Sequence, residues 1–131
     1  MEIRKTMNKQ REIKFRAWDE KNKMWIIKSL EDLLQWSADG NYQNRDMEFV
    51  VWEQYTGLKD RNGKEIYEGD IVSLKEYTPT HKVIFKDGAF YADGWTNTLA
   101  ELMTDWSSNI DPTTIEVIGN VHENPELLKN N

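Results

Sequence analysis

The stretch "YTGLKDRNGKEIYEGDIVSL", residues 55–74, decides the fold because pairs of turn-forming residues divide its few apolar positions into short segments. At its centre lies Asn62–Gly63, two residue types that tolerate the positive φ angles needed at both central positions of a type I′ hairpin turn. Residues 58–61 are therefore expected to pair with residues 64–67. A second turn and a further strand follow over residues 68–74. Most charges of this stretch are thereby assigned to turns and to solvent-facing sides of strands.

On the N-terminal side, period-two alternation predicts a hairpin over residues 13–28 and a strand over residues 47–55. Between them, a helical pattern of leucines preceded by a Ser29/Asp32 capping box predicts a short helix over residues 30–37. The first strand is expected to be half-buried, with one apolar side and one side that combines two cations with an aromatic ring. The apolar side holds Ile13, Phe15 and Ala17, and the other side holds Lys14, Arg16 and Trp18.

On the C-terminal side, Asp87–Gly88 predicts a second tight hairpin, between a strand through Phe85 and a strand through Phe90. The segment "TLAELMTDW", residues 98–106, has helical spacing and begins with a second capping box. A last strand over residues 115–118 is followed by Gly119, which permits a bulge, and Asn124 is expected to cap a helical turn that Pro125 begins. Seven or eight short strands with two small helices predict one mainly β domain, either a barrel or a sandwich.

The composition narrows the class of protein. A chain of 131 residues suits one domain, and its six Trp, five Tyr and four Phe must supply much of the buried area. The absence of cysteine excludes disulfides, thiolate nucleophiles, cysteine-ligated zinc and iron–sulfur clusters, and fits a reducing cytosol. No apolar run is long enough for a signal peptide or a membrane span. We therefore expect a cytoplasmic protein without membrane association.

The charge is unevenly distributed along the chain. The net charge is −6, yet residues 1–16 hold six Lys or Arg against two Glu, so the rest of the chain is more acidic than the total. An acidic body repels phosphate backbones, which disfavours nucleic acid as a partner. We expect residues 1–10 to form a flexible basic arm and residues 11–131 to form the single β domain.

Side chains that could carry catalysis or bind a metal lack the spacing that such sites need. The two histidines, His81 and His122, fit no metal-binding motif. None of the five serines lies in a G-x-S-x-G elbow, and none of the seven glycines forms a phosphate-binding loop. Glu65, Glu68 and Asp70 could approach a divalent ion but are interpreted as parts of solvated turns. The sequence therefore predicts no catalytic residue, no metal site and no cofactor.

Four blocks of sequence stand out together: "REIKFRAWDEKNKMW" (residues 11–25), "QYTGLKDRNGKEIYEGDIV" (54–72), "VIFKDGAF" (83–90) and "EVIGNVHENPELL" (116–128). In this order and spacing they resemble the YopX family, small proteins encoded by phages and prophages. The resemblance implies a mainly β fold built on an SH3-like barrel core, to which the patterns above add further hairpins and two short helices. It also implies a phage or prophage origin and expression in the host cytoplasm, but no activity.

These observations favour a non-enzymatic accessory protein that binds another macromolecule, with an unidentified host or phage protein as the preferred partner. An alternative is single-stranded nucleic-acid binding through the N-terminal strand and Arg11. A second alternative is a metal-dependent hydrolase. Self-association is a further possibility, because surplus tryptophans and open strand edges often become subunit contacts. The candidate binding residues are Lys14, Arg16, Trp18, Tyr55 and Tyr67.

Overall fold

The computed structural model describes residues 12–29, 31–32, 34–35, 47–74, 77–104 and 115–128, and the predicted basic arm over residues 1–10 lies outside them. The described part contains eight strands and, besides the helical residues 31–32 and 34–35, three short helical elements. The strands are β1 (Phe15–Asp19), β2 (Met24–Ile27), β3 (Val50–Lys59), β4 (Glu65–Tyr67), β5 (Asp70–Leu74), β6 (Tyr77–Lys86), β7 (Ala89–Ala92) and β8 (Glu116–Asn120). The helical elements are η2 (Met47–Phe49), α3 (Leu99–Thr104) and η5 (Pro125–Leu128).

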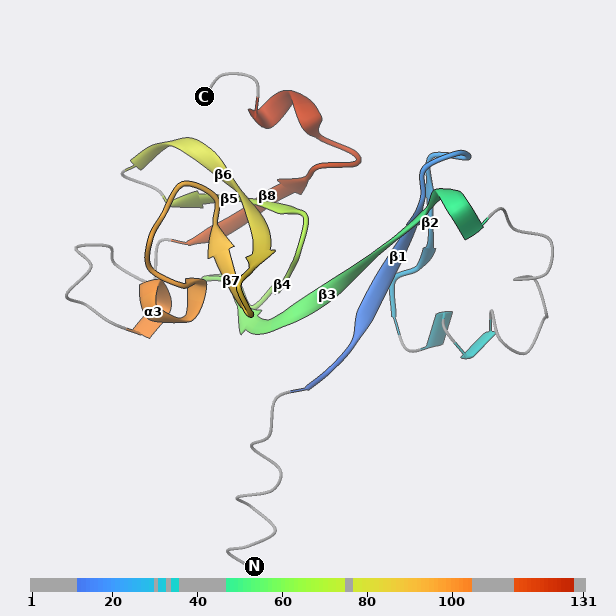
Figure 1. Ribbon diagram of the computed structural model, residues 1–131, viewed down its shortest axis with the longest axis horizontal. Coiled ribbons are helices and arrows are strands. Elements are labelled where there is room, and N and C mark those ends of the chain that lie inside the picture. The colour runs from blue at the N-terminus through green and yellow to red at the C-terminus, as the bar shows by residue number, and fades with distance from the viewer. Residues whose placement is uncertain are drawn as a thin grey trace, which may run out of the picture.

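The strands form two antiparallel sheets, so the prediction of a mainly β fold is confirmed. The first sheet has the order β2-β1-β3-β4, and the second has the order β7-β6-β5-β8. Strand β3 crosses from the β1–β2 hairpin to the half of the molecule that contains the second sheet (Figure 1). The long strand β3 of the first sheet therefore reaches the second sheet, although among the described strands it pairs only with β1 and β4.

Strand β3 corrects the prediction of two separate strands at residues 47–55 and 58–61. It runs unbroken over ten residues, and Met47–Phe49 forms a 3-10 turn before it. Its pairing with β4 shifts register between Tyr55 and Lys59, which marks a bulge. The hydroxyl of Thr56 bridges this bulge, because it donates to the carbonyl of Ile66 at 2.7 Å and accepts the N–H of Leu58 at 3.1 Å.

Of the two predicted tight hairpin turns, one is confirmed and the other is wrong. At Asp87–Gly88 both residues have positive φ, 51° and 83°, so the tight turn expected there is confirmed. At Asn62–Gly63 the type I′ prediction is wrong, because among these two only Gly63 has positive φ. Instead the carboxylate of Asp60 accepts the N–H groups of Asn62 and Lys64 at 2.8 and 2.9 Å. A side chain outside the predicted dipeptide thus shapes the turn.

Asp60 also joins this turn to the second sheet. Its other carboxylate oxygen accepts the N–H of Val117 in β8 at 2.8 Å, at the edge of β8 that faces away from β5. Burial raises the pKa of Asp60, but the backbone donors of Val117, Lys64 and Asn62 outweigh it, and the net pKa is lowered. The ionised carboxylate is therefore the form that the fold stabilises.

Asp60→Asn is expected to lower the free energy of unfolding near neutral pH by about 2 kcal/mol, because hydrogen bonds to charged acceptors contribute roughly 1.5–3 kcal/mol. Since the folded pKa lies below the unfolded one, Asp60 contributes its stability above about pH 4, and this is lost as pH falls through the folded pKa. Urea unfolding of both proteins should show a difference that shrinks toward acid pH. An equal difference at neutral pH and at about pH 3 would contradict this explanation.

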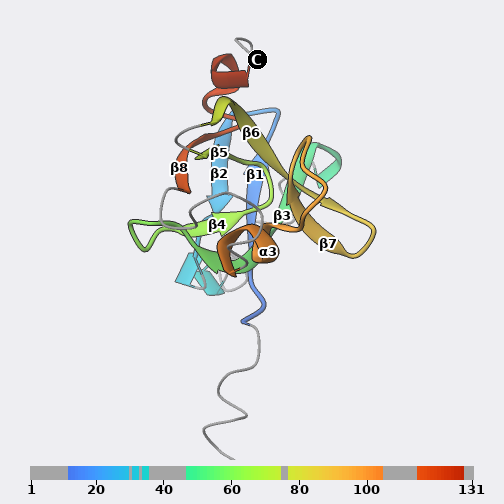
Figure 2. The same cartoon turned by 90° about the vertical axis from the view of Figure 1, so that its left-hand side faces the viewer.

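The hydrophobic core lies between the second sheet and α3, which is next to β7 in both views (Figures 1 and 2). The predicted capping box of α3 is confirmed: the N–H of Glu101 donates to the hydroxyl of Thr98 at 3.1 Å, and the Glu101 carboxylate accepts the N–H of Thr98 at 2.8 Å. The predicted continuation to residue 106 lies outside the described residues. The core comprises Ile66, Val72, Leu74, Val83, Phe90, Ala92, Leu99, Leu102, Ile115 and Val117.

The remaining local predictions hold in part. Residues 31–32 and 34–35 are helical, and Ser29 accepts the N–H of Asp32 at 3.1 Å, as expected of a cap. The register of β8 shifts beside Gly119, which confirms the predicted bulge. The helical turn that begins at Pro125 is present, but Asn124 does not cap it with its side chain, because that amide oxygen accepts the N–H of Asn120 at 3.2 Å.

Candidate functional site: a cleft between the two sheets

The prediction for the first strand holds only for Ala17, which lies on the predicted apolar side and is fully buried. Ile13 is 63% exposed, whereas Trp18 is only 4% exposed and the Arg16 side chain 11%. The expectation that Arg16 and Trp18 lie on the open face is therefore wrong. The neighbours Ala17 and Trp18 are thus both covered, although strict alternation would bury only one.

Arg16 is buried because charged partners from both sheets meet it. Its Nε lies 2.9 Å from Glu53 Oε1 in β3, and its Nη2 lies 2.9 Å from Asp70 Oδ1 in β5. The same Nη2 donates to the carbonyl of Glu68 at 3.2 Å. Its guanidinium carbon lies 4.6 Å from the ring centre of Trp25 and 4.8 Å from that of Tyr67. Arg16 therefore connects the first sheet to the start of the second.

The energetic cost of burying this ion pair is seen in the pKa of Asp70. Burial raises the pKa of its carboxyl, although Arg16 and the backbone N–H of Tyr67, which donates to Oδ2 at 2.8 Å, both favour the ionised form. Removal of two charges from water is not fully offset by their attraction. The ion pair therefore serves mainly to hold the two sheets in one relative position.

His122, in the turn after β8, extends the charged network to the C-terminal segment. Its Nε2 lies 2.9 Å from Glu53 Oε2, and its ring stacks on Trp18 with centroids 5.0 Å apart and an interplanar angle of 15°. Its Nδ1 lies 3.8 Å from Glu20 Oε2, which also accepts the indole N–H of Trp18 at 2.9 Å. Glu53 thus binds Arg16 with one oxygen and His122 with the other.

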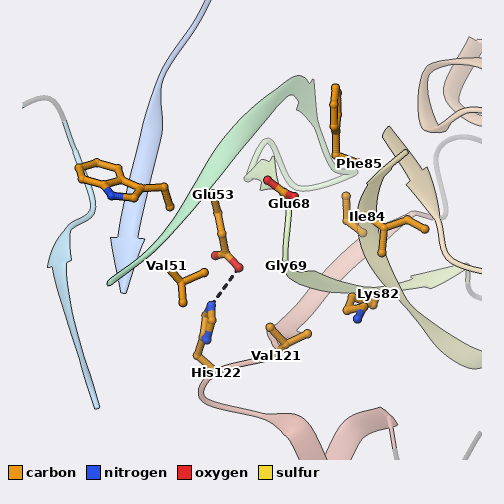
Figure 3. Close-up of a pocket in the computed structure, with 11 residues that line it drawn as sticks. Val51, Glu53, Glu68, Gly69, Lys82, Ile84, Phe85, Val121 and His122 are labelled. Carbon is orange, nitrogen blue, oxygen red and sulfur yellow. Dashed lines mark hydrogen bonds and ion pairs between the residues drawn. The ribbon is translucent and has the colours of Figure 1, made fainter. Parts of the chain in front are cut away.

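A cleft of about 350 Å³ opens beside this network, and Figure 3 shows Glu53 and His122 directed toward each other at its base. Apolar side chains from both sheets line it, and two of them, Val51 and Phe85, are 37% and 49% exposed. Charged side chains stand at its walls. The lining comprises Val51, Trp52, Glu53, Glu68, Gly69, Lys82, Val83, Ile84, Phe85, Val121 and His122.

The pairing of β3 with β1 shows which side chains of β3 face the cleft. Val51 pairs with Trp18 and Glu53 pairs with Arg16, so their side chains lie on the face that looks toward the second sheet. Trp52 pairs with Ala17 and has its side chain on the opposite face. The apolar surface that β3 presents to the cleft is therefore that of Val51.

The five predicted binding residues do not form one exposed patch. Lys14 pairs with the carboxylate of Glu65, and its Nζ lies 4.9 Å from the ring centre of Tyr55. Tyr55 and Tyr67 are buried with ring centroids 5.4 Å apart, and burial raises the pKa of both phenols. These three, together with Arg16, stiffen the junction of β1, β3 and β4. A role in binding a partner stays a prediction for all five.

The acidic residues of the central stretch lie in different surroundings. Glu65 pairs with Lys14, Asp70 pairs with Arg16, and the carboxylate of Glu68 lies 3.4 Å from the backbone nitrogen of Gln54. Within the part of the chain that the structure describes, no three His, Asp or Glu side chains gather as a metal site would require. The described helices also include none with the length and apolar character of a membrane span.

Sequence reasoning missed the residues that form the cleft. Val51, Glu53 and Phe85 occupy ordinary strand positions, and His122 follows a bulge. The sequence did contain one signal for the buried pair. Glu53 is the single acidic residue of the segment that forms β3, and Arg16 is a cation within the segment that forms β1. Two opposite charges within strands are suited to form a buried pair. No sequence pattern around His122 indicated that its side chain would contact Glu53.

A sequence model described as YopX protein matches residues 14–129, and the chain therefore belongs to the YopX family. It is 33% identical over 114 residues to the "SPbeta prophage-derived uncharacterized protein YopX" of Bacillus subtilis (strain 168), a match that covers 80% of this chain and 75% of that protein. It is also similar to the crystal structure of protein EF1440 from Enterococcus faecalis. That likeness has a TM-score of 0.62 and 29% identity, and it covers 90% of this chain and 99% of that one.

Proposed function

We propose that this protein is a non-enzymatic accessory protein of a phage or prophage, and that it binds another protein through the cleft between its two sheets. The name of the Bacillus relative, which describes it as prophage-derived, supports the genetic setting. A cytoplasmic site of action in the host agrees with a chain that lacks cysteine. Within this proposal, the curved second sheet and the β4 hairpin correspond to the SH3-like core expected of the family.

One observation carries the proposal: apolar side chains of both sheets remain exposed at a concave surface. Val51 from β3 and Phe85 from β6 are about as exposed as surface residues, and each lies in the same strand as a buried residue, Glu53 in β3 and Val83 in β6. Concave surfaces with apolar walls and a few polar groups are typical binding sites. The buried Glu53–His122 pair gives this cleft a fixed base, which reduces the cost of ordering it when a partner binds.

The nucleic-acid alternative is less well supported by the same geometry. Arg16 already contacts two carboxylates, and the Trp18 ring is covered by His122. A base could stack on Trp18 only after displacing that imidazole. Arg11 lies outside the described residues. The hydrolase alternative would need side chains that gather around a metal or a nucleophile, and the described residues at the cleft supply a histidine and carboxylates that are bonded to one another.

Val51→Asp is expected to reduce capture of a partner at least about tenfold, because a charge at the centre of an apolar contact is strongly unfavourable. Ile118→Asp is the matched control, since Ile118 is 38% exposed but lies in β8 outside the cleft. Both variants would be tagged and recovered from host cells that express the phage genes, with partners identified by mass spectrometry. Equal capture by both variants, at equal melting temperature, would refute binding through the cleft.

A further inference from the structure

We infer that the cleft takes its partner as an extended peptide strand that hydrogen-bonds to the edge of β6 at Phe85. This inference rests on the proposed function and names the kind of segment that binds. It depends first on the directions of the backbone groups at the cleft and on two charged side chains at its walls. It depends also on Glu68–Gly69, which already lies between the edges of β3 and β6 next to the cleft.

Backbone hydrogen bonds show which side of β6 is open. Asp93 N–H donates to Lys82 C=O at 2.8 Å, so Lys82 and Ile84 direct their backbone groups toward β7. The intervening residues Val83 and Phe85 direct theirs to the opposite side, where β5 pairs with β6 only as far as its first residues. No strand among the described residues pairs with this side of β6 beyond Val83. The N–H and C=O of Phe85 therefore face the cleft.

The turn between β4 and β5 shows that backbone groups of β3 and β6 can be bonded from the space between the two sheets. Glu68 N–H donates to Gln54 C=O in β3 at 2.9 Å, and Gly69 N–H donates to Val83 C=O in β6 at 2.9 Å. These two residues thus bridge the edges of β3 and β6 by backbone bonds alone. Beyond the bridge, the strands continue to Val51 and Phe85, which line the cleft. A peptide strand there would continue the same pattern with the next open backbone groups.

Two charged side chains at the walls define the chemistry of the peptide. Lys82 lines the cleft, and among the described residues no acidic side chain pairs with it. Glu68 also lines the cleft, and within the described parts of the chain its carboxylate makes one long contact, to the backbone nitrogen of Gln54 at 3.4 Å. Figure 3 shows both among the side chains that line the cleft. A complementary strand carries apolar residues flanked by one basic and one acidic residue.

The test uses synthetic peptides and the full-length, 15N-labelled protein. The parent peptide is an acetylated and amidated strand of about seven alternating valine and threonine residues with lysine at one end and glutamate at the other, long enough to span roughly 20 Å. Its control has the same side chains but N-methylated backbone amides, so it cannot donate to β6. We expect the parent to shift the Phe85 amide resonance and slow its hydrogen exchange, and N-methylation to weaken binding about tenfold.

A charge variant gives an independent check. With Lys82→Glu, both charged walls become acidic, so a peptide with lysine at both ends should bind better than the parent, reversing the order found with wild type. Equal binding of the parent and N-methylated peptides, or no binding of any peptide, would overturn the strand inference. Neither result affects the partner-capture experiment with Val51→Asp, whose failure alone would refute binding through the cleft.

Discussion

Arg16→Met is expected to lower the free energy of unfolding by about 3–5 kcal/mol, because it leaves the buried carboxylates of Glu53 and Asp70 without their cation. The methionine keeps much of the apolar stem, so the loss reports on the charge and its hydrogen bonds. Urea unfolding followed by tryptophan fluorescence measures it. A loss under about 1 kcal/mol would show that the two acids are satisfied in another way, for example by protonation of Asp70.

Two further variants separate the causes of this loss. Arg61→Met is the matched control, since Arg61 makes a 3.8 Å contact with Glu116 at the surface and such pairs contribute at most about 1 kcal/mol. Arg16→Lys retains a positive charge but cannot hold Glu53 and Asp70 at once with the planar geometry of a guanidinium. It is expected to recover only part of the stability, and full recovery would mean that charge alone matters.

Gly69→Ala is expected to lower the free energy of unfolding by at least about 3 kcal/mol. Gly69 has φ of 90°, where a side chain costs roughly 1–2 kcal/mol, and an added Cβ would lie 2.0 Å from Glu53 Oε2. Glu53 would have to move away from Arg16 and His122, the two groups that it binds. Urea unfolding and the partner-capture experiment should therefore both detect this variant.

Gly88→Ala separates backbone strain from collision with Glu53. Gly88 has φ of 83°, nearly that of Gly69, but no atom lies within 4 Å of its added Cβ. Its loss should be about 1–2 kcal/mol, so the excess in Gly69→Ala measures the displacement of Glu53. In a Glu53→Ala background that excess should disappear. Equal losses for the two glycine variants in the wild-type background would contradict the packing of Gly69 against Glu53.

The same residues support both the fold and the cleft. Glu53 lies at the base of the cleft, and it is held by Arg16 from β1 and by His122 from the segment after β8. A partner that fits between Val51 and Phe85 therefore meets walls whose separation depends on this network. Destabilising variants of Arg16 and Gly69 should accordingly weaken capture even at temperatures at which the protein is folded.

Several features of this protein followed from the sequence alone because neighbouring residues are sufficient to produce them. The tight turn at Asp87–Gly88 needs only residues that accept positive φ, and the cap of α3 needs only Thr98 and Glu101 at the right spacing. The turn after β3 failed as a local prediction because Asp60 shapes it while bonding to Val117, far along the chain. Local chemistry therefore determined the turn at Asp87–Gly88 and the cap of α3, but not the course of the long strand β3 or the turn after it.

Only the tertiary structure decided which side of β1 is buried, and with it the site. Both sides of that strand carry aromatic or aliphatic residues, so alternation indicated two faces without indicating which one would meet the second sheet. Arg16 lies inward because the carboxylates of Glu53 and Asp70, 37 and 54 residues further along the chain, both bind its guanidinium. The cleft exists because β3 extends past the Glu68–Gly69 bridge, and the relative position of two sheets is set by contacts between residues distant in sequence.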